Sequence, residues 1–288
     1  MAITTKNWAD LSKDERISLL QRPAISQDAS IRDTTARIIA RVRLRGDEAL
    51  RELTKDLDGA QLKEFRVSAT EVEAAASALS VEAHDAIDLA IRNVRAFHEA
   101  QLPSGIRVET MPGVICERVS HSLDAVGLYV PAGTAPLPSA AIMLAVPATI
   151  AGCPTKILCT PPRPDGTADP AVLVAATRAG VTDIFKVGGA QAIAAMAYGT
   201  ESIPKVCKVF GPGNAYVTSA KAQVGNDPGG AAMDLPAGPS EVLVIADAQA
   251  SAEFVASDLL SQAEHGVDSQ VVLVTTSSEL AAAVTEEI

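Results

Sequence analysis

Apolar residues recur at two different spacings along this chain, which divides it into two kinds of predicted structure. Over the first hundred residues the spacing is helical. Two helix starts carry the polar pairs typical of capping boxes: Ser12 with Glu15, and Thr70 with Glu73. Another helix is predicted over residues 81–102, because Pro103 follows it. Residues 106–120 alternate on both sides of Met111-Pro112-Gly113, which predicts a β-hairpin.

From residue 127 onward the pattern alternates between short apolar strands and helices. The predicted strands cover residues 127–130, 155–160, 181–187, 205–210, 241–246 and 270–275. The predicted helices cover residues 139–151, 168–179, 190–198, 215–224 and 251–265. Strictly alternating strands and helices are typical of a parallel sheet with helices on both faces. We therefore expect an α/β fold, with crossovers between packed domains near residues 127 and 238.

Three glycine-containing turns follow predicted strands, at residues 131–134, 188–191 and 211–214. Such turns lie at the carboxyl ends of parallel strands, where backbone N–H groups can approach a phosphate. None matches the dinucleotide fingerprint, since Tyr216 stands where the last turn would need its third glycine. Any one of them could serve packing alone. Three in succession, flanked by Tyr129, Gln191 and Asn214, favour a cofactor cleft.

The predicted helix 251–265 ends in a pair of polar residues. Gln262 and His265 are one helical turn apart and share a face with Asp258. Glu264 points about 100° away from His265, so these neighbours do not form an acid/base pair. One interpretation is that His265 interacts with the carbonyl end of the helix. The alternative is half of a zinc site, which two ligands cannot complete.

Composition restricts the class of protein. The chain has 288 residues, 48% of them hydrophobic, which is enough for a sizeable core. A formal net charge of −11 argues against a nucleic-acid surface and favours a small-molecule ligand. The first ten residues lack the pattern of a signal peptide, and the apolar stretch 140–151 is short and contains Pro147. We expect a cytoplasmic protein that binds neither membrane nor nucleic acid.

The four cysteines, Cys116, Cys153, Cys159 and Cys207, form no CxxC pair, which argues against a disulfide framework. Free cysteines are mostly buried small apolar groups. A nucleophilic thiol at Cys153 or Cys207 stays open as an alternative, although neither has a histidine nearby in the sequence.

Five segments together resemble histidinol dehydrogenase in sequence and order. They are YVPAGTAPLPS at 129–139, VGGAQAI at 187–193, FGPGNAYV at 210–217, AGPSE at 237–241 and SQAEHG at 261–266. The resemblance covers the whole chain. It implies a zinc- and NAD-dependent homodimeric enzyme of histidine biosynthesis, which oxidises L-histidinol to L-histidine through a bound aldehyde.

The resemblance also implies roles for individual residues. Tyr129, Gln191 and Asn214 match the family's NAD contacts, and Ser240 matches a substrate contact. Gln262 and His265 match two zinc ligands that also touch the substrate. The family's catalytic Glu-His pair, a zinc-binding Asp and a further zinc-binding His are expected downstream of Ile288, so no catalytic residue is assigned in this chain. Ala132 also departs from the family pattern, which has a glycine there.

The expected architecture is two doubly wound, Rossmann-like parallel-sheet domains with a helical N-terminal region, without the C-terminal part of the family fold. Residues 1–126 would form that helical region and the first part of domain one, 127–237 the cofactor domain, and 238–288 the return to domain one with the metal-ligand helix. Two other functions stay open. One is a non-catalytic nucleotide- or imidazole-binding module, and the other is an aldehyde dehydrogenase-like enzyme, which would leave Gln262 and His265 unexplained.

Overall fold

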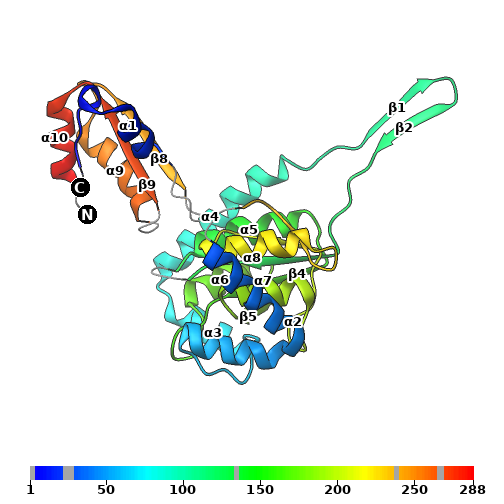
Figure 1. Cartoon of the computed structure of the whole chain (residues 1–288). Coiled ribbons are helices and arrows are strands. Elements are labelled where there is room, and N and C mark those ends of the chain that lie inside the picture. The colour runs from blue at the N-terminus through cyan, green and yellow to red at the C-terminus, as the bar shows by residue number, and fades with distance from the viewer. Residues whose placement is uncertain (1–3, 22–28, 133–135, 237–239, 265–268) are drawn as a thin grey trace. The chain divides into compact units, whose positions relative to one another are not determined.

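The computed structural model describes residues 4–21, 29–132, 136–236, 240–264 and 269–288 (Figure 1). The chain forms two compact units. Unit 1 combines residues Met1–Asp28 with Pro239–Ile288, and unit 2 is Ala29–Gly238. Each unit has its own hydrophobic core and is described separately.

Unit 2 contains a parallel sheet of five strands in the order β5-β4-β3-β6-β7. Its strands are β3 (Ala125–Tyr129), β4 (Thr155–Thr160), β5 (Asp183–Lys186), β6 (Lys208–Phe210) and β7 (Ala232–Met233). Its helices are α2 (Ala29–Asp58), α3 (Ala69–Ala78), α4 (Val81–Glu99), α5 (Pro138–Ile150), α6 (Pro170–Arg178), α7 (Gly189–Tyr198) and α8 (Ala215–Asn226). The chain starts at the central strand β3, runs outward to β5, and then crosses back to β6, as in a doubly wound fold.

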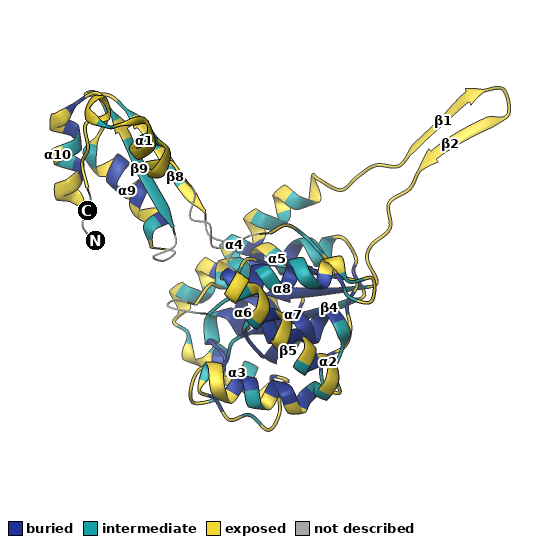
Figure 2. Cartoon of the chain, in the orientation of Figure 1, coloured by how far each residue is buried: buried dark blue, intermediate teal, exposed yellow. Residues whose placement is uncertain are grey.

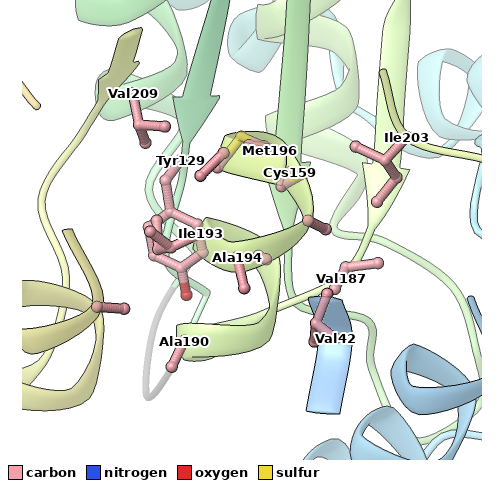
Figure 3. Packing of buried hydrophobic residues seen from close by; sticks show 14 of the residues in the cluster. Val42, Tyr129, Cys159, Val187, Ala190, Ile193, Ala194, Met196, Ile203 and Val209 are labelled. Atoms are coloured by element: carbon pink, nitrogen blue, oxygen red, sulfur yellow. The ribbon is translucent and has the colours of Figure 1, made fainter. Parts of the chain in front are cut away.

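Helices cover both faces of this sheet, and successive strand residues therefore enter different cores. Ile157 and Cys159 of β4 pack with α2, α7 and α8, in the core drawn in Figure 3. Leu158, between them, packs with α5 and α6 on the opposite face. This period of two is the strand geometry, and burial on both faces explains why these strands are almost continuously apolar.

Local sequence signals account for the helix ends. Asp169 caps α6 by accepting hydrogen bonds from the N–H groups of Ala171 and Val172, and Pro170 occupies the first helical position. Gly152 follows the end of α5 and Gly180 that of α6, both with positive φ, where a side chain would be strained.

A hairpin of β1 (Ile106–Met111) and β2 (Val114–Arg118) also belongs to unit 2. Every residue of both strands is exposed, including apolar ones (Figure 2). The hairpin thus has no packed face among the described residues.

Unit 1 is smaller. It consists of the 3-10 helix η1 (Trp8–Asp10), α1 (Lys13–Leu19), β8 (Glu241–Ala246), α9 (Ala252–Ala263), β9 (Gln270–Thr275) and α10 (Ser278–Glu287). Strands β8 and β9 are parallel, and α9 and α10 pack on them through Val255, Leu259 and Leu280. This β-α-β-α order continues the alternation predicted from the sequence.

The predicted α/β fold, parallel sheets and hairpin are confirmed, with three corrections in detail. The second capping box was placed wrongly: Ser68 and Glu71 form it instead of Thr70 and Glu73, because both pairs satisfy the same spacing. Helix α9 ends at Ala263, and the short strand β7 was missed. No helix in the described part of the chain has the length and apolar character needed to span a membrane.

The compact units divide the chain differently from the expected domains. The boundary expected at 237/238 lies next to the division at 238/239. Residues 29–126, in contrast, belong to the unit that contains the sheet of β3 to β7. The reason is that α2 packs against α7 and α8, while α3 and α4 pack against α5 and α6. The assignment of the cofactor to residues 127–237 stays a prediction.

Candidate functional site

The topology of unit 2 indicates where a ligand would bind. In open parallel sheets, ligands bind outside the carboxyl ends of the strands where the chain reverses its direction of winding. Here that point lies between the neighbouring strands β3 and β6. β3 ends at Tyr129 and β6 ends at Phe210, directly before the turn that leads to Asn214. Two of the predicted cofactor residues thus flank the switch point.

Tyr129 connects the switch point to the second glycine turn. Its side chain is 3% exposed, and its hydroxyl oxygen accepts a hydrogen bond of 2.9 Å from the backbone N–H of Gly189. Figure 3 shows the ring beside Ile193, with the hydroxyl directed toward the end of α7 that carries Ala190. Burial raises the pKa of Tyr129 well above its ordinary value, so the hydroxyl stays protonated.

Gln191, in the first turn of α7, is 1% exposed. Its Nε2 donates to Asp58 Oδ2 over 3.4 Å, a long hydrogen bond. Its Oε1 is buried and has no hydrogen-bond partner among the described residues. A buried acceptor without a partner lowers the stability of the fold by about 1–3 kcal/mol, and native proteins contain few such groups. The carboxamide is therefore a candidate for a ligand contact.

The sequence pattern did not indicate Asp58, which lies at the end of α2. Its carboxylate lies against the second turn, because a Cβ added to Gly188 would be 3.2 Å from Asp58 Oδ1. Burial raises the pKa of Asp58 to about 6, and the hydrogen bond from Gln191 acts in the opposite direction. No local pattern indicates this contact, because Asp58 and Gln191 are far apart in sequence.

Glycine is required at two positions of the turns. Gly189 has a φ of +62°, and a Cβ there would lie 2.7 Å from Gln191 Oε1. Gly211 has a φ of +126°, and a Cβ there would lie 2.1 Å from the carbonyl oxygen of Tyr129. The second turn thus approaches Gln191, and the third turn approaches Tyr129. Both approaches are too close for a residue with a Cβ. Gly133 and Thr134 of the first turn lie outside the described residues.

Asn214 is the N-cap of α8. Its Oδ1 accepts a hydrogen bond of 3.1 Å from the N–H of Val217, and the residue is exposed. The first turn of a helix offers unpaired N–H groups and the positive end of the helix dipole, which together favour an anion such as a phosphate. Asn214 therefore both starts this helix and lies at the surface beside the switch point.

The predicted substrate and metal residues belong to unit 1. Ser240 Oγ donates to Gln262 Oε1 over 3.2 Å, and Gln262 Nε2 donates to Ser269 Oγ over 3.3 Å. The structure thus brings Ser240 and Gln262 together. His265 lies outside the described residues. Ser269 was not anticipated, although it follows Gln262 at a distance of only seven residues.

No group of three His, Cys, Asp or Glu side chains in the described part of the chain could hold a metal ion. Gln262 contributes one amide oxygen, which is already hydrogen-bonded to Ser240. These residues alone do not complete a zinc site.

The cysteines show little sign of a nucleophile. Cys153 and Cys159 are buried, and Cys116 and Cys207 are exposed. Burial raises the pKa of Cys159 far above its ordinary value, which disfavours a thiolate. His84 is partly buried, and its Nε2 lies 2.9 Å from the carbonyl oxygen of Ala76.

Comparison with known proteins identifies the family. Residues 20–288 match the family model of histidinol dehydrogenase. The chain is 55% identical to histidinol dehydrogenase of Xanthomonas campestris pv. campestris (strain 8004), over 99% of this chain and 66% of that protein. It is 53% identical to the enzyme of Vibrio parahaemolyticus serotype O3:K6, over 98% and 64%.

A solved structure supports the same family assignment. The crystal structure of histidinol dehydrogenase from Elizabethkingia anophelis matches with a TM-score of 0.86 and 45% identity, over 96% of this chain and 63% of that one. The chain therefore spans somewhat less than two thirds of the length of these relatives. By the family model and by these identities, the chain belongs to the histidinol dehydrogenase family.

Proposed function

We propose that this chain supplies the NAD-binding unit, and part of the substrate site, of an enzyme that oxidises L-histidinol to L-histidine through L-histidinal. The observation that carries the proposal is Gln191 Oε1, a buried acceptor without a partner among the described residues, beside two glycine turns at the switch point. Membership of the family favours this enzyme over a non-catalytic binding module.

NAD fits the residues present. When bound, it accepts a hydride from the carbon that carries the substrate hydroxyl. The chain's own residues would position it: Gln191 would offer a carbonyl oxygen, and the start of α8 at Asn214 would offer backbone N–H groups to an anionic group. Tyr129 orients the second glycine turn, because its hydroxyl oxygen accepts a hydrogen bond from the N–H of Gly189.

The proposed substrate site is less complete. Ser240 and Gln262 are hydrogen-bonded to each other, and either could bind a polar group of histidinol. The imidazole and amine of histidinol are good zinc donors, which makes a zinc ion with Gln262 and His265 chemically reasonable. Zinc enters the proposal through the family, and we derive no step through it, because the described residues do not complete its site.

The proposal includes a homodimer in the cytoplasm, both through the family resemblance. The exposed apolar residues of the β1–β2 hairpin support the dimer. Isolated two-stranded hairpins are marginally stable in water, so this one gains from contact with another chain. Light scattering coupled to size-exclusion chromatography measures the mass directly, and a monomer at micromolar concentration would contradict this part of the proposal.

Calorimetric titration with NAD tests the cofactor site. Asn214→Ala removes both the side-chain contact and the helix cap, whereas Asn214→Ser keeps a capping oxygen. We expect both variants to weaken NAD binding, by about 5-fold or more if one hydrogen bond to the cofactor is lost. Asn226→Ala, at the exposed opposite end of the same helix, is the matched control and should bind normally. Wild-type affinity in Asn214→Ser would limit Asn214 to capping, and absence of NAD binding by the unmodified chain would refute the proposed site.

A further inference from the structure

A buried ion pair lies directly beneath the third glycine turn. Lys221, in the second turn of α8, has a side chain that is 0% exposed and pairs with Asp234, which follows β7. Asp234 is itself only 15% exposed. Neither residue was singled out in the sequence, although Lys221 occupies the buried face of α8 between Val217 and Val224.

The two charged groups bind both backbone polar groups of one residue. Lys221 Nζ donates to the carbonyl oxygen of Gly211 over 2.7 Å. Asp234 Oδ2 accepts a hydrogen bond of 2.9 Å from the N–H of the same Gly211. The ion pair closes a ring of interactions through Gly211, which we call the Gly211 clamp.

Stability alone does not account for this arrangement. Removing two charges from water costs several kcal/mol per ion, and apolar pairs of similar volume are often as stable or more so. The ion pair does what an apolar pair cannot: it satisfies the carbonyl and the N–H group of Gly211, a residue that lies outside both β6 and α8. Its effect is therefore on the conformation of the turn.

That conformation matters because the turn joins two predicted cofactor residues. The backbone of Gly211 lies against the carbonyl oxygen of Tyr129, and Asn214 starts α8 only three residues later. We infer that Lys221 and Asp234 are positioning residues, which hold the turn from Gly211 to Asn214 in the conformation that binds the cofactor. This inference rests on the proposed function for its ligand, but its structural part does not.

A charge-free replacement separates positioning from stability. In Lys221→Met the carboxylate of Asp234 is left without its partner, so the unit should lose stability. In the double variant Lys221→Met/Asp234→Leu the charges disappear together, so thermal stability should recover part of the loss seen in Lys221→Met. It should stay below that of the wild type, because both backbone polar groups of Gly211 lose their partners. We expect NAD affinity of the double variant to stay about 10-fold weaker, since a displaced turn misplaces its contacts.

Hydrogen exchange of the peptide that covers residues 209–217 provides a readout that needs no cofactor. We expect faster exchange in the double variant than in the wild type, with the rest of unit 2 unchanged. The matched control is Lys186→Met/Glu71→Leu, which removes another buried lysine pair, with an Nζ to Oε1 distance of 2.6 Å, from β5 and α3. The control should alter neither NAD affinity nor exchange at 209–217.

The outcomes decide between the explanations. Wild-type exchange at 209–217 in a stable double variant would overturn the inference, as would wild-type NAD affinity. If the wild-type chain itself fails to bind NAD, the proposed function fails, and exchange alone decides the role of the clamp. If the double variant does not fold, Lys221→Met/Asp234→Asn is judged by the same two measurements. It removes both charges and the donor to the carbonyl oxygen of Gly211, but keeps an acceptor for the N–H of Gly211.

Discussion

Replacing Asp58 by Asn should make unit 2 more stable at pH 8 and leave it nearly unchanged at pH 4. The reason is that burial raises the pKa of this carboxyl to about 6 from its ordinary 3.8. Between these two values the folded chain binds more protons at Asp58 than the unfolded chain does. Any stabilisation from this group is thus present below pH 3.8 and is lost as the pH rises through 6.

The magnitude follows from the two pKa values. One pKa unit corresponds to about 1.36 kcal/mol. The difference of about 2 between the folded and unfolded pKa of Asp58 therefore lowers the free energy of unfolding by about 3 kcal/mol at pH 8. Asp58 is partly exposed, and solvent screens its charge, so we expect a gain of about 1–2 kcal/mol for Asp58→Asn at pH 8. The new carboxamide keeps an oxygen to accept from Gln191 Nε2, which limits other effects of the change.

Urea unfolding followed by circular dichroism at pH 8 and pH 4 measures this difference, and both values lie away from the sequence pI of about 4.9. With about 2–3 kcal/mol per molar urea for a unit of this size, the midpoint should rise by about 0.3–1 M at pH 8. Asp56→Asn, which removes the same charge from an exposed position two residues earlier, should show no such dependence on pH. An equal effect of Asp58→Asn at both pH values, or a loss of stability at pH 8, would refute the reasoning.

Three further predictions follow from described contacts. Ser68→Ala should cost about 1 kcal/mol in urea unfolding and Thr70→Ala clearly less, since Ser68 caps α3; the opposite order would restore the capping box expected from the sequence. Gln191→Leu should leave the free energy of unfolding unchanged or raise it by up to about 2 kcal/mol, because a buried acceptor disappears, yet it should weaken NAD binding in calorimetry; undiminished affinity would exclude Gln191 from the site. A thiol reagent should modify Cys116 and Cys207 rapidly in the folded chain, and Cys153 and Cys159 only on unfolding. Replacing any cysteine by Ser should leave NAD affinity intact, and a loss of affinity on changing Cys153 or Cys207 would support a functional thiol.

Much of the fold could be predicted because each strand is bounded by residues with distinct turn preferences. The predicted limits of β4, β8 and β9 coincide with those of the structure. The error at α3 has a physical basis, since Ser68 with Glu71 and Thr70 with Glu73 offer the same capping chemistry two residues apart. Which pair forms the cap depends on where the chain enters the helix, and tertiary contacts determine that point.

The candidate site was predictable only where local sequence carries the information. Tyr129, Gln191 and Asn214 adjoin glycine turns, and the structure links their surroundings through Gly189 and Gly211. Asp58 escaped notice because its partner Gln191 is distant in sequence. Lys221 could have been identified from the sequence, because a lysine on the apolar face of a helix requires a buried anion.

The two cores on opposite faces of the unit 2 sheet have a consequence for how this chain tolerates change. Neighbouring residues of one strand, such as Ile157 and Leu158, belong to different cores, with the hydrogen-bonded backbone between them. Substitutions on opposite faces share no side-chain neighbours, so their effects on stability should add, whereas those on one face should be coupled. Tyr129 belongs to the core on the α7–α8 side of the sheet, and Gln191 lies on α7. We therefore expect the core that contains Tyr129 to be less sensitive to substitutions on the α5–α6 side than to substitutions on its own side.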